Sequence, residues 1–210
     1  MAFTGVFYNT DLPSDVIQVL CEDIKKFDKD RLNATVGVPG DGGGVVDHRI
    51  RNSQNIWLST DHWIVGFLWH YVMKANRENF MYDLTHIDSE TVQYTFYDEG
   101  MFYNWHTDSS LSSWETPFKE KLSDDEKIAN HHLQECDKIR KLSFVLQLSD
   151  PFDYQGGQLE LLDDWDNRHL APRAQGTLIV FDSRMKHRVT KIKKGHRQSI
   201  VGWVMGPRWK

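Results

Sequence analysis

The chain has 210 residues, of which 40% are hydrophobic and 26% are charged, and its formal net charge is −5. This length and balance fit one globular domain covering residues 1–210 and exclude a largely disordered or collagen-like chain. The negative charge provides no surface for a nucleic-acid backbone, so we expect no nucleic-acid partner. Without a signal-peptide pattern, a bilayer-length apolar segment or closely paired cysteines, the sequence predicts a reduced, cytoplasmic protein with no membrane partner.

Two amphipathic helices are predicted in the first part of the chain. Apolar side chains recur at helical spacing over Pro13–Asp28 and again over Ser59–Phe80. We expect Ser59, Thr60 or Asp61 to cap the N-terminus of the second helix. This part of the chain is interpreted as a helical support region for the segments that follow.

The helical period disappears after Ser89, and short runs rich in β-branched and aromatic residues then alternate with turn residues. The sequence therefore predicts a mainly β protein with N-terminal helices, an α+β arrangement whose strands form a sandwich or barrel. We divide the chain into the support region, 1–90, and a β core, 91–210. The predicted strands are Thr91–Tyr97, Phe102–Thr107, Lys141–Leu148, Gln158–Leu162, Gly176–Phe181, His187–Ile192 and Gln198–Met205.

A polar insertion, residues 109–137, interrupts the predicted strands. It contains the run Ser123-Asp124-Asp125-Glu126, which is typical of a helix start. Long insertions in compact domains commonly carry function, so we expect this one to act as a mobile lid over a binding site.

The pattern His-x-Asp occurs twice, at His86 with Asp88 and at His106 with Asp108. With 10 histidines and 30 acidic residues in the chain, about one such pair is expected by chance. The first pair lies in a polar segment ahead of the strands, whereas the second lies at the end of a predicted strand. Residues two apart on a strand point to the same face, so His106 and Asp108 are the better candidates for binding one metal ion.

His187 is the candidate third ligand, because it opens a predicted strand. Two histidines and one carboxylate on one face of an octahedral metal leave three positions open, which suits non-haem iron(II), although zinc would also be accepted. Taken alone, His187 is better explained as a histidine whose hydrogen bonds are satisfied inside a barrel.

Arg197 follows His187 across a turn at Lys193-Lys194-Gly195. A hairpin that is symmetric about this turn would place His187 and Arg197 on the same face. The guanidinium is a rigid fork of donors that matches a carboxylate, so Arg197 would hold the far end of a dicarboxylate that chelates the metal. The alternative interpretation is an ordinary surface arginine in a basic hairpin.

The segment from Tyr97 to Asp108 resembles the Y-x-x-G-x-x-Y-x-x-H-x-D signature of the prolyl 4-hydroxylase-like branch of the Fe(II)/2-oxoglutarate-dependent oxygenases, in particular its short bacterial-type hydroxylases. Other segments resemble further motifs of this family in the family's order, so that the likeness covers roughly residues 45–207. These segments are Arg49–Ser53, Arg140–Ser143, Gly156–Leu161, Lys186–Val189 and Gly195–Val204.

This resemblance implies a double-stranded β-helix, or jelly-roll, in residues 91–210, which would then form the catalytic core with the insertion at 109–137. It implies an oxidoreductase of the dioxygenase class that uses iron(II) and O2, converts 2-oxoglutarate to succinate and CO2, and hydroxylates a substrate. Ascorbate is a further expected cofactor. A protein prolyl residue is the first candidate substrate, but the long insertion leaves the choice open between a protein or peptide and a small molecule.

The resemblance also implies a role for each matching residue. His106, Asp108 and His187 would bind the iron, and Arg197 would bind the distal carboxylate of 2-oxoglutarate. Tyr97 would assist Arg197. The match further implies that Gln147, which strand alternation turns inward, provides another polar contact to the cosubstrate.

Two other kinds of protein remain open at this stage. One is a non-catalytic β-helix protein that keeps a metal for stability or for sensing a small carboxylate. Arg197 argues against it, because a purely structural ion would not need an arginine at that position. The other is a zinc hydrolase, for which the sequence offers no evident general base. The oligomeric state and the metal bound on purification are not predicted.

Overall fold

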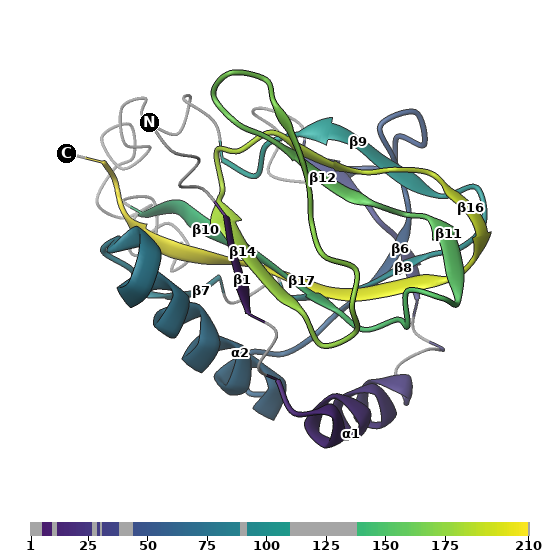
Figure 1. Ribbon diagram of the computed structural model, residues 1–210, viewed down its shortest axis with the longest axis horizontal. Coiled ribbons are helices and arrows are strands. Elements are labelled where there is room, and N and C mark those ends of the chain that lie inside the picture. The colour runs from purple at the N-terminus through teal and green to yellow at the C-terminus, as the bar shows by residue number, and fades with distance from the viewer. Residues whose placement is uncertain are drawn as a thin grey trace, which may run out of the picture.

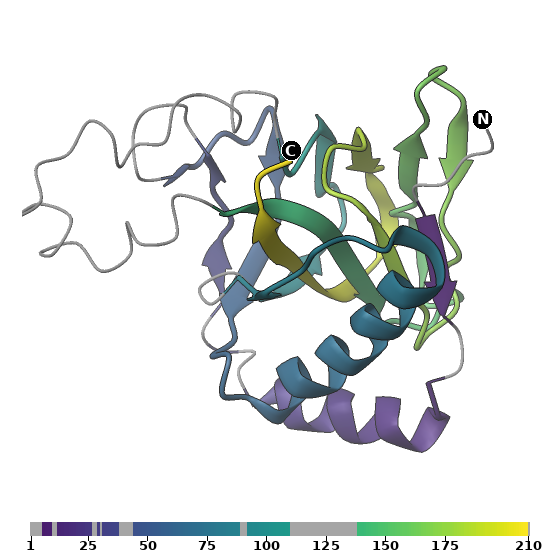
Figure 2. The same ribbon diagram turned by 90° about the vertical axis from the view of Figure 1, so that its left-hand side faces the viewer.

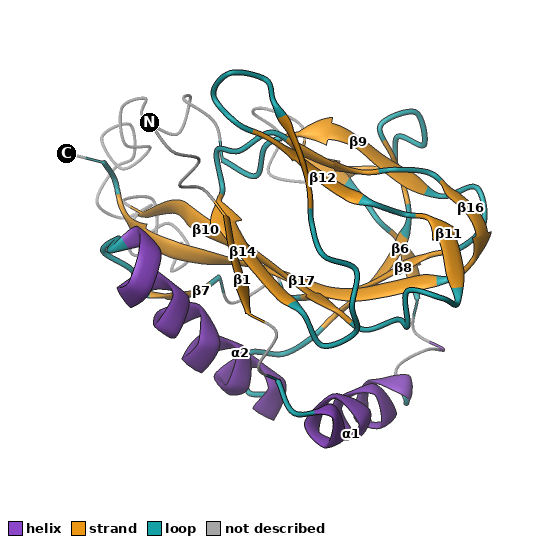
Figure 3. Ribbon diagram, in the orientation of Figure 1, coloured by secondary structure: helices purple, strands orange, loops and turns teal. Residues whose placement is uncertain are grey.

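A computed structural model gives the structure of the chain and describes residues 6–9, 12–26, 29, 31–37, 44–88, 92–109 and 138–209. Apart from Ser109, the predicted lid at 109–137 lies outside the described residues. The described part is mainly β with helices near the N-terminus, as the sequence predicted (Figures 1 and 3).

Both predicted helices are present and are shorter than expected. α1 is Ser14–Lys25 and α2 is Trp63–Ala75, which continues into a short π-helix, η2, at Asn76–Phe80. Asn76 is 5% exposed, and its side chain hydrogen-bonds to Tyr82, just beyond the last residue of η2. Its side-chain amide donates to the Tyr82 carbonyl and accepts from the Tyr82 N–H, in both cases at 2.9 Å.

The predicted cap of α2 was wrong. Nδ1 of His62 accepts the backbone N–H of Ile64 at 3.4 Å, so the N-cap is His62 and not Ser59, Thr60 or Asp61. The reason is a separate turn ahead of the helix, in which the N–H of His62 donates to the carbonyl of Ser59 at 3.0 Å. This turn delays the start of the helix.

Both helices cover one face of the larger sheet (Figures 1 and 2). Their buried side chains are Ile17, Leu20 and Ile24 on α1 and Ile64, Val65, Leu68, Val72 and Ala75 on α2. On the sheet they share one cluster with Leu142, Phe144, Leu146, Leu178, Val180, Ile200 and Val204. Each buried side chain of the Val, Leu, Ile or Phe type contributes about 1.5–3 kcal/mol, so this first core fixes the helices to the sheet.

Among the described residues, the larger sheet has eight strands in the order β1-β14-β10-β17-β8-β6-β2, with β7 paired to β17 off this path. Its neighbouring strands are antiparallel. The strands are β1 (Val6–Asn9), β14 (Leu178–Asp182), β10 (Lys138–Gln147), β17 (Arg197–Pro207), β8 (Gln93–Tyr97), β6 (Gln54–Trp57), β2 (Leu32–Asn33) and β7 (His86–Ile87).

The smaller sheet has five strands in the order β13-β12-β15-β9-β5, and two further strand pairs, β11-β16 and β3-β4, stand beside the main sheets. The strands of the smaller sheet are β13 (Arg168–Leu170), β12 (Leu159–Leu162), β15 (His187–Val189), β9 (Phe102–His106) and β5 (Arg51–Asn52). The strands of the two further pairs are β11 (Tyr154–Gly156), β16 (Ile192–Gly195), β3 (Val36–Gly37) and β4 (Gly44–Val45).

A second core fills the space between the two main sheets. Its buried residues are Tyr97, Val145, Tyr154, Leu159, Leu161, Ala171, Ile179, Phe181, Val189 and Ile192. On β10, Phe144 and Leu146 belong to the helix-side core while Val145 belongs to this one, which is the alternation expected of a strand. The two facing antiparallel sheets form a double-stranded β-helix, or jelly-roll.

All seven predicted strands are present, with shifted ends, as β8, β9, β10, β12, β14, β15 and β17. The description of residues 1–90 as helical was incomplete, because β1, β2 and β6 extend the larger sheet and β5 extends the smaller one. These strands have only two to four residues, which is too short for an alternating pattern to be recognised. The division of the chain at residue 90 remains a prediction.

The predicted hairpin between the strands of His187 and Arg197 does not form. β15 pairs with β12 and β9 in the smaller sheet, β16 pairs with β11, and β17 pairs with β10 and β8 in the larger sheet. Strand parity assumes one continuous ladder, and here the chain changes sheets between the two residues. His187 and Arg197 therefore belong to opposite layers.

No helix in the described ranges combines the length and the apolar character that crossing a membrane requires.

Position 202 of β17 needs glycine, because it lies against the ring of Phe144 on β10. The two residues are direct partners in the register, and a Cβ on Gly202 would lie within 2.9 Å of the Phe144 ring. Gly202→Ala is expected to lower the free energy of unfolding by about 1–3 kcal/mol, measured by urea denaturation.

Gly66→Ala on α2 is the matched control, because a Cβ there meets no atom within 4 Å. This change is expected to raise stability by about 0.5–1 kcal/mol, since alanine favours a helix over glycine. Equal effects of the two changes would contradict the packing assigned to Gly202.

Candidate functional site

A cavity that is partly open to solvent lies between the two main sheets. Its walls carry side chains of both layers. The polar lining residues are Arg51, Gln93, Tyr97, Tyr103, His106, Asp108, His187, Arg197, Ser199 and Trp203. The apolar lining residues are Val145, Leu159, Phe181, Val189 and Val201.

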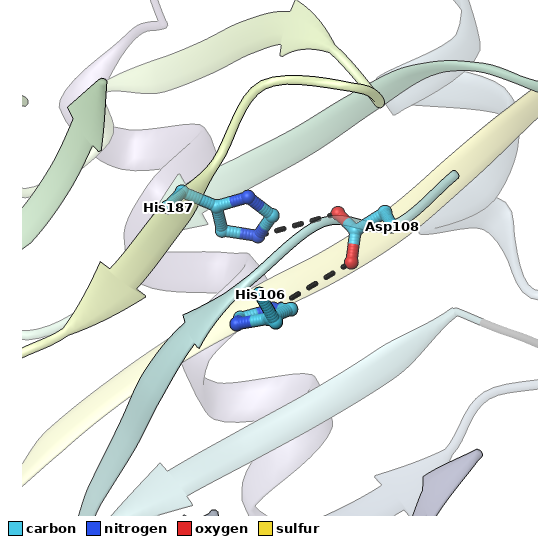
Figure 4. A group of neighbouring side chains, drawn as sticks. All are labelled: His106, Asp108 and His187. Carbon is cyan, nitrogen blue, oxygen red and sulfur yellow. Dashed lines mark ion pairs between the residues drawn. The ribbon is translucent and has the colours of Figure 1, made fainter. Parts of the chain in front are cut away.

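The predicted metal-binding residues His106, Asp108 and His187 meet in this cavity (Figure 4). His106 ends β9, His187 begins β15, and the two are direct partners in the antiparallel register. Asp108 turns its carboxylate toward both rings, with Oδ1 at 3.6 Å from Nε2 of His106 and Oδ2 at 3.3 Å from Nε2 of His187. One donor atom from each residue lies within 4.8 Å of the others, so the three are spaced to hold one ion.

Backbone carbonyls fix the tautomer of both histidines. Nδ1 of His106 lies 2.8 Å from the Asn104 carbonyl, and Nδ1 of His187 lies 2.9 Å from the Met185 carbonyl. A carbonyl only accepts, so each Nδ1 carries the proton. In the neutral ring this leaves the lone pair on Nε2, the atom that faces Asp108, and such an outer hydrogen bond is typical of metal-ligating histidines.

The charge state of the site also suits a cation. Burial, and after it the neighbouring His187, lowers the pKa of His106 to about 3. Burial raises the pKa of Asp108, but His187, His106 and the Ser143 hydroxyl outweigh it, so the net shift is downward. At neutral pH His106 is thus neutral and Asp108 ionised, which are the protonation states that a metal ion requires.

The competing pair, His86 and Asp88, lies elsewhere. His86 belongs to β7 and pairs with Met205, while the carboxylate of Asp88 lies 3.3 Å from the guanidinium of Arg140. Neither residue lines the cavity. Within the part of the chain that the structure describes, the cavity triad is the one group of three or more His, Cys, Asp or Glu residues close enough to hold an ion.

Arg197 lines the same cavity and is 1% exposed, so the alternative interpretation as a surface arginine is wrong. Its Nη2 donates to Oε1 of Gln147 at 2.9 Å, and its Nη1 donates to Ser199 at 3.4 Å. Nε has no hydrogen-bond partner, and no described carboxylate pairs with the guanidinium. A buried charge without a counter-ion is costly, so this arrangement calls for an anionic ligand.

The two predicted helpers of Arg197 differ in position. Tyr97 lines the cavity, lies opposite Arg197 in the register, and has its ring 5.4 Å from the guanidinium carbon. Gln147 is not among the lining residues. Its amide is used by Arg197 and by the carbonyl of Pro172, at 3.1 Å, so Gln147 positions the guanidinium from behind.

A second buried guanidinium, that of Arg51, was not predicted as a site residue. It is 7% exposed, lines the cavity, and donates to Ser53 at 2.9 Å, to Gln93 at 3.0 Å and to the Thr35 carbonyl at 3.3 Å. As with Arg197, the described residues give it no carboxylate partner.

Tyr103 connects Arg51 to the triad. Its ring is stacked on His106, with centroids 3.5 Å apart and planes at 14°, and the Arg51 guanidinium lies 4.8 Å from its centroid. Burial raises the pKa of Tyr103 to about 12, so its hydroxyl stays protonated. Both residues lie in segments that carry the family resemblance, but the pairing of Arg51 with Tyr103 across β5 and β9 gives them their place at the site.

The residues present fit an iron ion and a dicarboxylate. Two neutral imidazoles and one carboxylate form the donor set of non-haem iron(II) centres, with positions left for other ligands. The guanidinium of Arg197 in the same cavity, whose Nε has no hydrogen-bond partner, fits the carboxylate at the far end of such a ligand.

The fold and the cavity together define a double-stranded β-helix protein with a His-Asp-His cluster between its sheets. The sequence model of the 2OG-Fe(II) oxygenase superfamily matches residues 92–205, which is more than half of the chain. The chain belongs to this superfamily, whose members use iron(II), 2-oxoglutarate and O2.

Sequence relatives include PKHD-type hydroxylases. The protein of that name from a Picosynechococcus species is 32% identical over 114 residues, which are 54% of this chain and 41% of the relative. One from Parvibaculum lavamentivorans is 30% identical over 108 residues, which are 51% of this chain and 38% of the relative. The matched region thus spans about two fifths of these relatives.

Solved structures share the fold. A Pseudomonas putida prolyl-4-hydroxylase has a TM-score of 0.67 at 22% identity, covering 99% of this chain and 95% of that one. A Trichoplax adhaerens prolyl hydroxylase, solved with a peptide fragment of the hypoxia inducible factor, has a TM-score of 0.69 at 17% identity, covering 97% and 84%. These similarities confirm the predicted jelly-roll.

The triad predicts that His106→Ala, Asp108→Ala and His187→Ala each weaken Mn(II) binding by roughly a hundredfold or more, because each removes one of three ligands and several kcal/mol of binding. Anaerobic calorimetric titration of the metal-free chain measures this, with circular dichroism to verify the fold. His86→Ala and Asp88→Ala are the controls and should retain wild-type affinity. Loss of binding in the controls but not in the triad variants would assign the metal to the other pair.

Proposed function

We propose that this chain is an iron(II)- and 2-oxoglutarate-dependent dioxygenase that hydroxylates its substrate. The observation that carries the proposal is the buried guanidinium of Arg197, which has no counter-ion among the described residues and shares one cavity with the His-Asp-His cluster. A metal bound only for stability would not need a buried cation facing it, whereas a metal-chelating dicarboxylate needs a positive partner at its far end.

Each residue of the cavity then has a task. His106, Asp108 and His187 bind iron(II), and Arg197 holds the distal carboxylate of 2-oxoglutarate with the Tyr97 hydroxyl beside it. Gln147 and Ser199 keep the guanidinium in place. Bound iron(II) with 2-oxoglutarate and O2 supplies the oxidising power that converts a C–H bond to C–OH, with succinate and CO2 as co-products. Ascorbate stays a predicted cofactor with no residue assigned to it.

The apolar walls of the cavity keep water away from the reacting atoms. They consist of Val145, Leu159, Phe181, Val189 and Val201, from strands of both sheets. A dry wall of this kind strengthens each electrostatic contact inside and limits side reactions.

We assign the substrate to the side of the cavity that carries Arg51, Gln93 and Tyr103. Arg51 has N–H groups left after its three hydrogen bonds, so this wall suits a substrate with oxygen acceptors such as peptide carbonyls. The Trichoplax neighbour was solved with a peptide fragment, which supports a peptide or protein substrate. A prolyl residue is the first candidate, and action in the cytoplasm remains part of the proposal.

The non-catalytic alternative predicts a different use of the same residues. A carboxylate sensor would bind 2-oxoglutarate through Arg197 without consuming it, so succinate formation separates the two. The zinc hydrolase alternative requires a general base in the cavity, and besides the triad the lining residues include no Asp, Glu or His.

The cosubstrate assignment predicts that Arg197→Ala weakens 2-oxoglutarate binding roughly ten- to a hundredfold, because a charge-assisted bidentate contact contributes about 1.5–3 kcal/mol. Arg197→Lys should recover part of this loss, since it keeps the charge but not the fork. Tyr97→Phe should lose less. Calorimetry on the anaerobic Mn(II) protein measures these affinities, and Mn(II) affinity itself should not change. An Arg197→Ala protein that binds 2-oxoglutarate like the wild type would sink the oxygenase assignment.

The substrate assignment predicts that Arg51→Met slows hydroxylation while 2-oxoglutarate affinity stays at the wild-type value. A library of prolyl peptides incubated with iron(II) and 2-oxoglutarate is analysed by mass spectrometry for the gain of one oxygen atom. For a peptide that gains oxygen, the variant should lose at least about tenfold in kcat/KM, the size of one lost charged hydrogen bond. An unchanged kcat/KM would remove Arg51 from the substrate site.

A further inference from the structure

Two buried serines, Ser143 and Ser183, hold the carboxylate of Asp108 from the side of the larger sheet. Ser143 Oγ, on β10, lies 2.7 Å from Oδ2 of Asp108, and Ser183 Oγ lies 2.9 Å from Ser143 Oγ. Both serines are 0% exposed. We propose that Ser143 is a positioning residue for the metal site, which holds the Asp108 carboxylate with Oδ2 toward His187 and Oδ1 toward His106.

The directions of these hydrogen bonds follow from the number of protons available. The ionised carboxylate of Asp108 only accepts, so the Ser143 hydroxyl must donate to it. With its one proton used, Ser143 Oγ can only accept from the hydroxyl of Ser183. Both hydroxyl dipoles therefore point toward the carboxylate, and a charge-assisted bond of this kind holds Oδ2 at one position.

The backbone of the turn between β14 and β15 also hydrogen-bonds to residues of the triad. The Ser183 carbonyl accepts the N–H groups of Asp108 and Ser109, each at 2.9 Å, and the Met185 carbonyl accepts Nδ1–H of His187. One short turn thus contacts two of the three triad residues, and it reaches Asp108 through both the main chain and the serine pair.

The turn itself is held by Asp182. Its carboxylate accepts the backbone N–H and the Nε–H of Arg184 at 2.8 and 2.9 Å, and the hydroxyl of Tyr82 at 2.7 Å. The Asp182 carbonyl also accepts the N–H of Met185 at 2.9 Å. A turn fixed at this many points is a rigid base from which Ser183 can orient Ser143.

The two carboxylate oxygens of Asp108 differ as a result. Oδ2 accepts from Ser143 and lies 3.3 Å from Nε2 of His187, whereas Oδ1 takes no part in the serine pair and lies 3.6 Å from Nε2 of His106. Without the Ser143 hydroxyl, the broad and roughly two-fold torsion of the carboxylate would let the oxygens exchange. The serine pair thus fixes which oxygen faces which histidine before any metal arrives. This inference rests on the proposed function only in so far as the site binds a metal.

The test compares Mn(II) affinity of full-length variants by anaerobic calorimetry without cosubstrate. Ser143→Ala is expected to weaken binding roughly ten- to a hundredfold, the usual effect of losing an outer hydrogen bond at a metal site. It is also expected to change the visible absorption spectrum of the Co(II)-loaded protein, which reports the geometry around the ion. Ser143→Thr keeps the hydroxyl and should restore both, and Ser183→Ala should give a smaller loss.

Ser149→Ala is the matched control. Ser149 Oγ accepts the N–H of Gln198 at 2.8 Å, so this change removes a serine hydrogen bond from the same sheet without touching Asp108. Wild-type affinity and spectrum in Ser143→Ala would overturn the proposal, and so would equal losses in Ser143→Ala and Ser149→Ala. Should Ser143→Ala fail to fold, the folded Ser183→Ala protein decides, because wild-type affinity there would also overturn it.

Failure of this inference is distinct from failure of the proposed function. A wild-type protein that binds Mn(II) but not 2-oxoglutarate would end the proposed function and leave the role of Ser143 intact. Wild-type metal affinity in Ser143→Ala, with 2-oxoglutarate still bound through Arg197, would do the reverse.

Discussion

The site depends on one strand register, the antiparallel pairing in which His106 of β9 lies opposite His187 of β15. Side chains alternate between the faces of a strand, so a slip of one residue would turn one imidazole away from the space between the sheets. The same sheet continues to β5, where Arg51 lies opposite Tyr103. The pairing of β15, β9 and β5 therefore brings together both histidines, the Tyr103 ring that stacks on His106 and the buried guanidinium of Arg51.

The charged and metal-ligating groups of the cavity are held by neutral partners. The histidines use backbone carbonyls, Asp108 uses a hydroxyl, and Arg197 uses the amide of Gln147 and the hydroxyl of Ser199. A neutral partner orients a charged group without cancelling its charge, whereas an ion pair does both. The cavity thus keeps its charge available for ligands, at a cost in stability that the two hydrophobic cores must offset.

Local pattern was sufficient to find much of this site from sequence. Helical spacing located α1 and α2, and the His-x-Asp spacing with the family resemblance linked His106 to Asp108, although Asp108 lies just beyond the end of β9. Pairing between distant strands could not be read in the same way. Arg197 reaches the cavity from the opposite sheet and not through a hairpin, and Arg51 joins it only because β5 pairs with β9. The use of Gln147 was also hidden, since an inward-facing amide can bind a ligand or a neighbouring side chain equally well.

His187 and Arg197 stand on opposing layers, so the distance between the His187 imidazole and the Arg197 guanidinium depends on the gap between two packed sheets, about 10 Å in general. Under the proposed function, the dicarboxylate must be long enough to span this gap. An acid one carbon shorter would leave one of its charged ends without a contact. Bulky side chains between the layers, such as Leu161 and Ile179, keep the sheets at their spacing. Under the proposed function, hydrophobic residues that need not touch the cosubstrate would thereby determine which length of dicarboxylate fits.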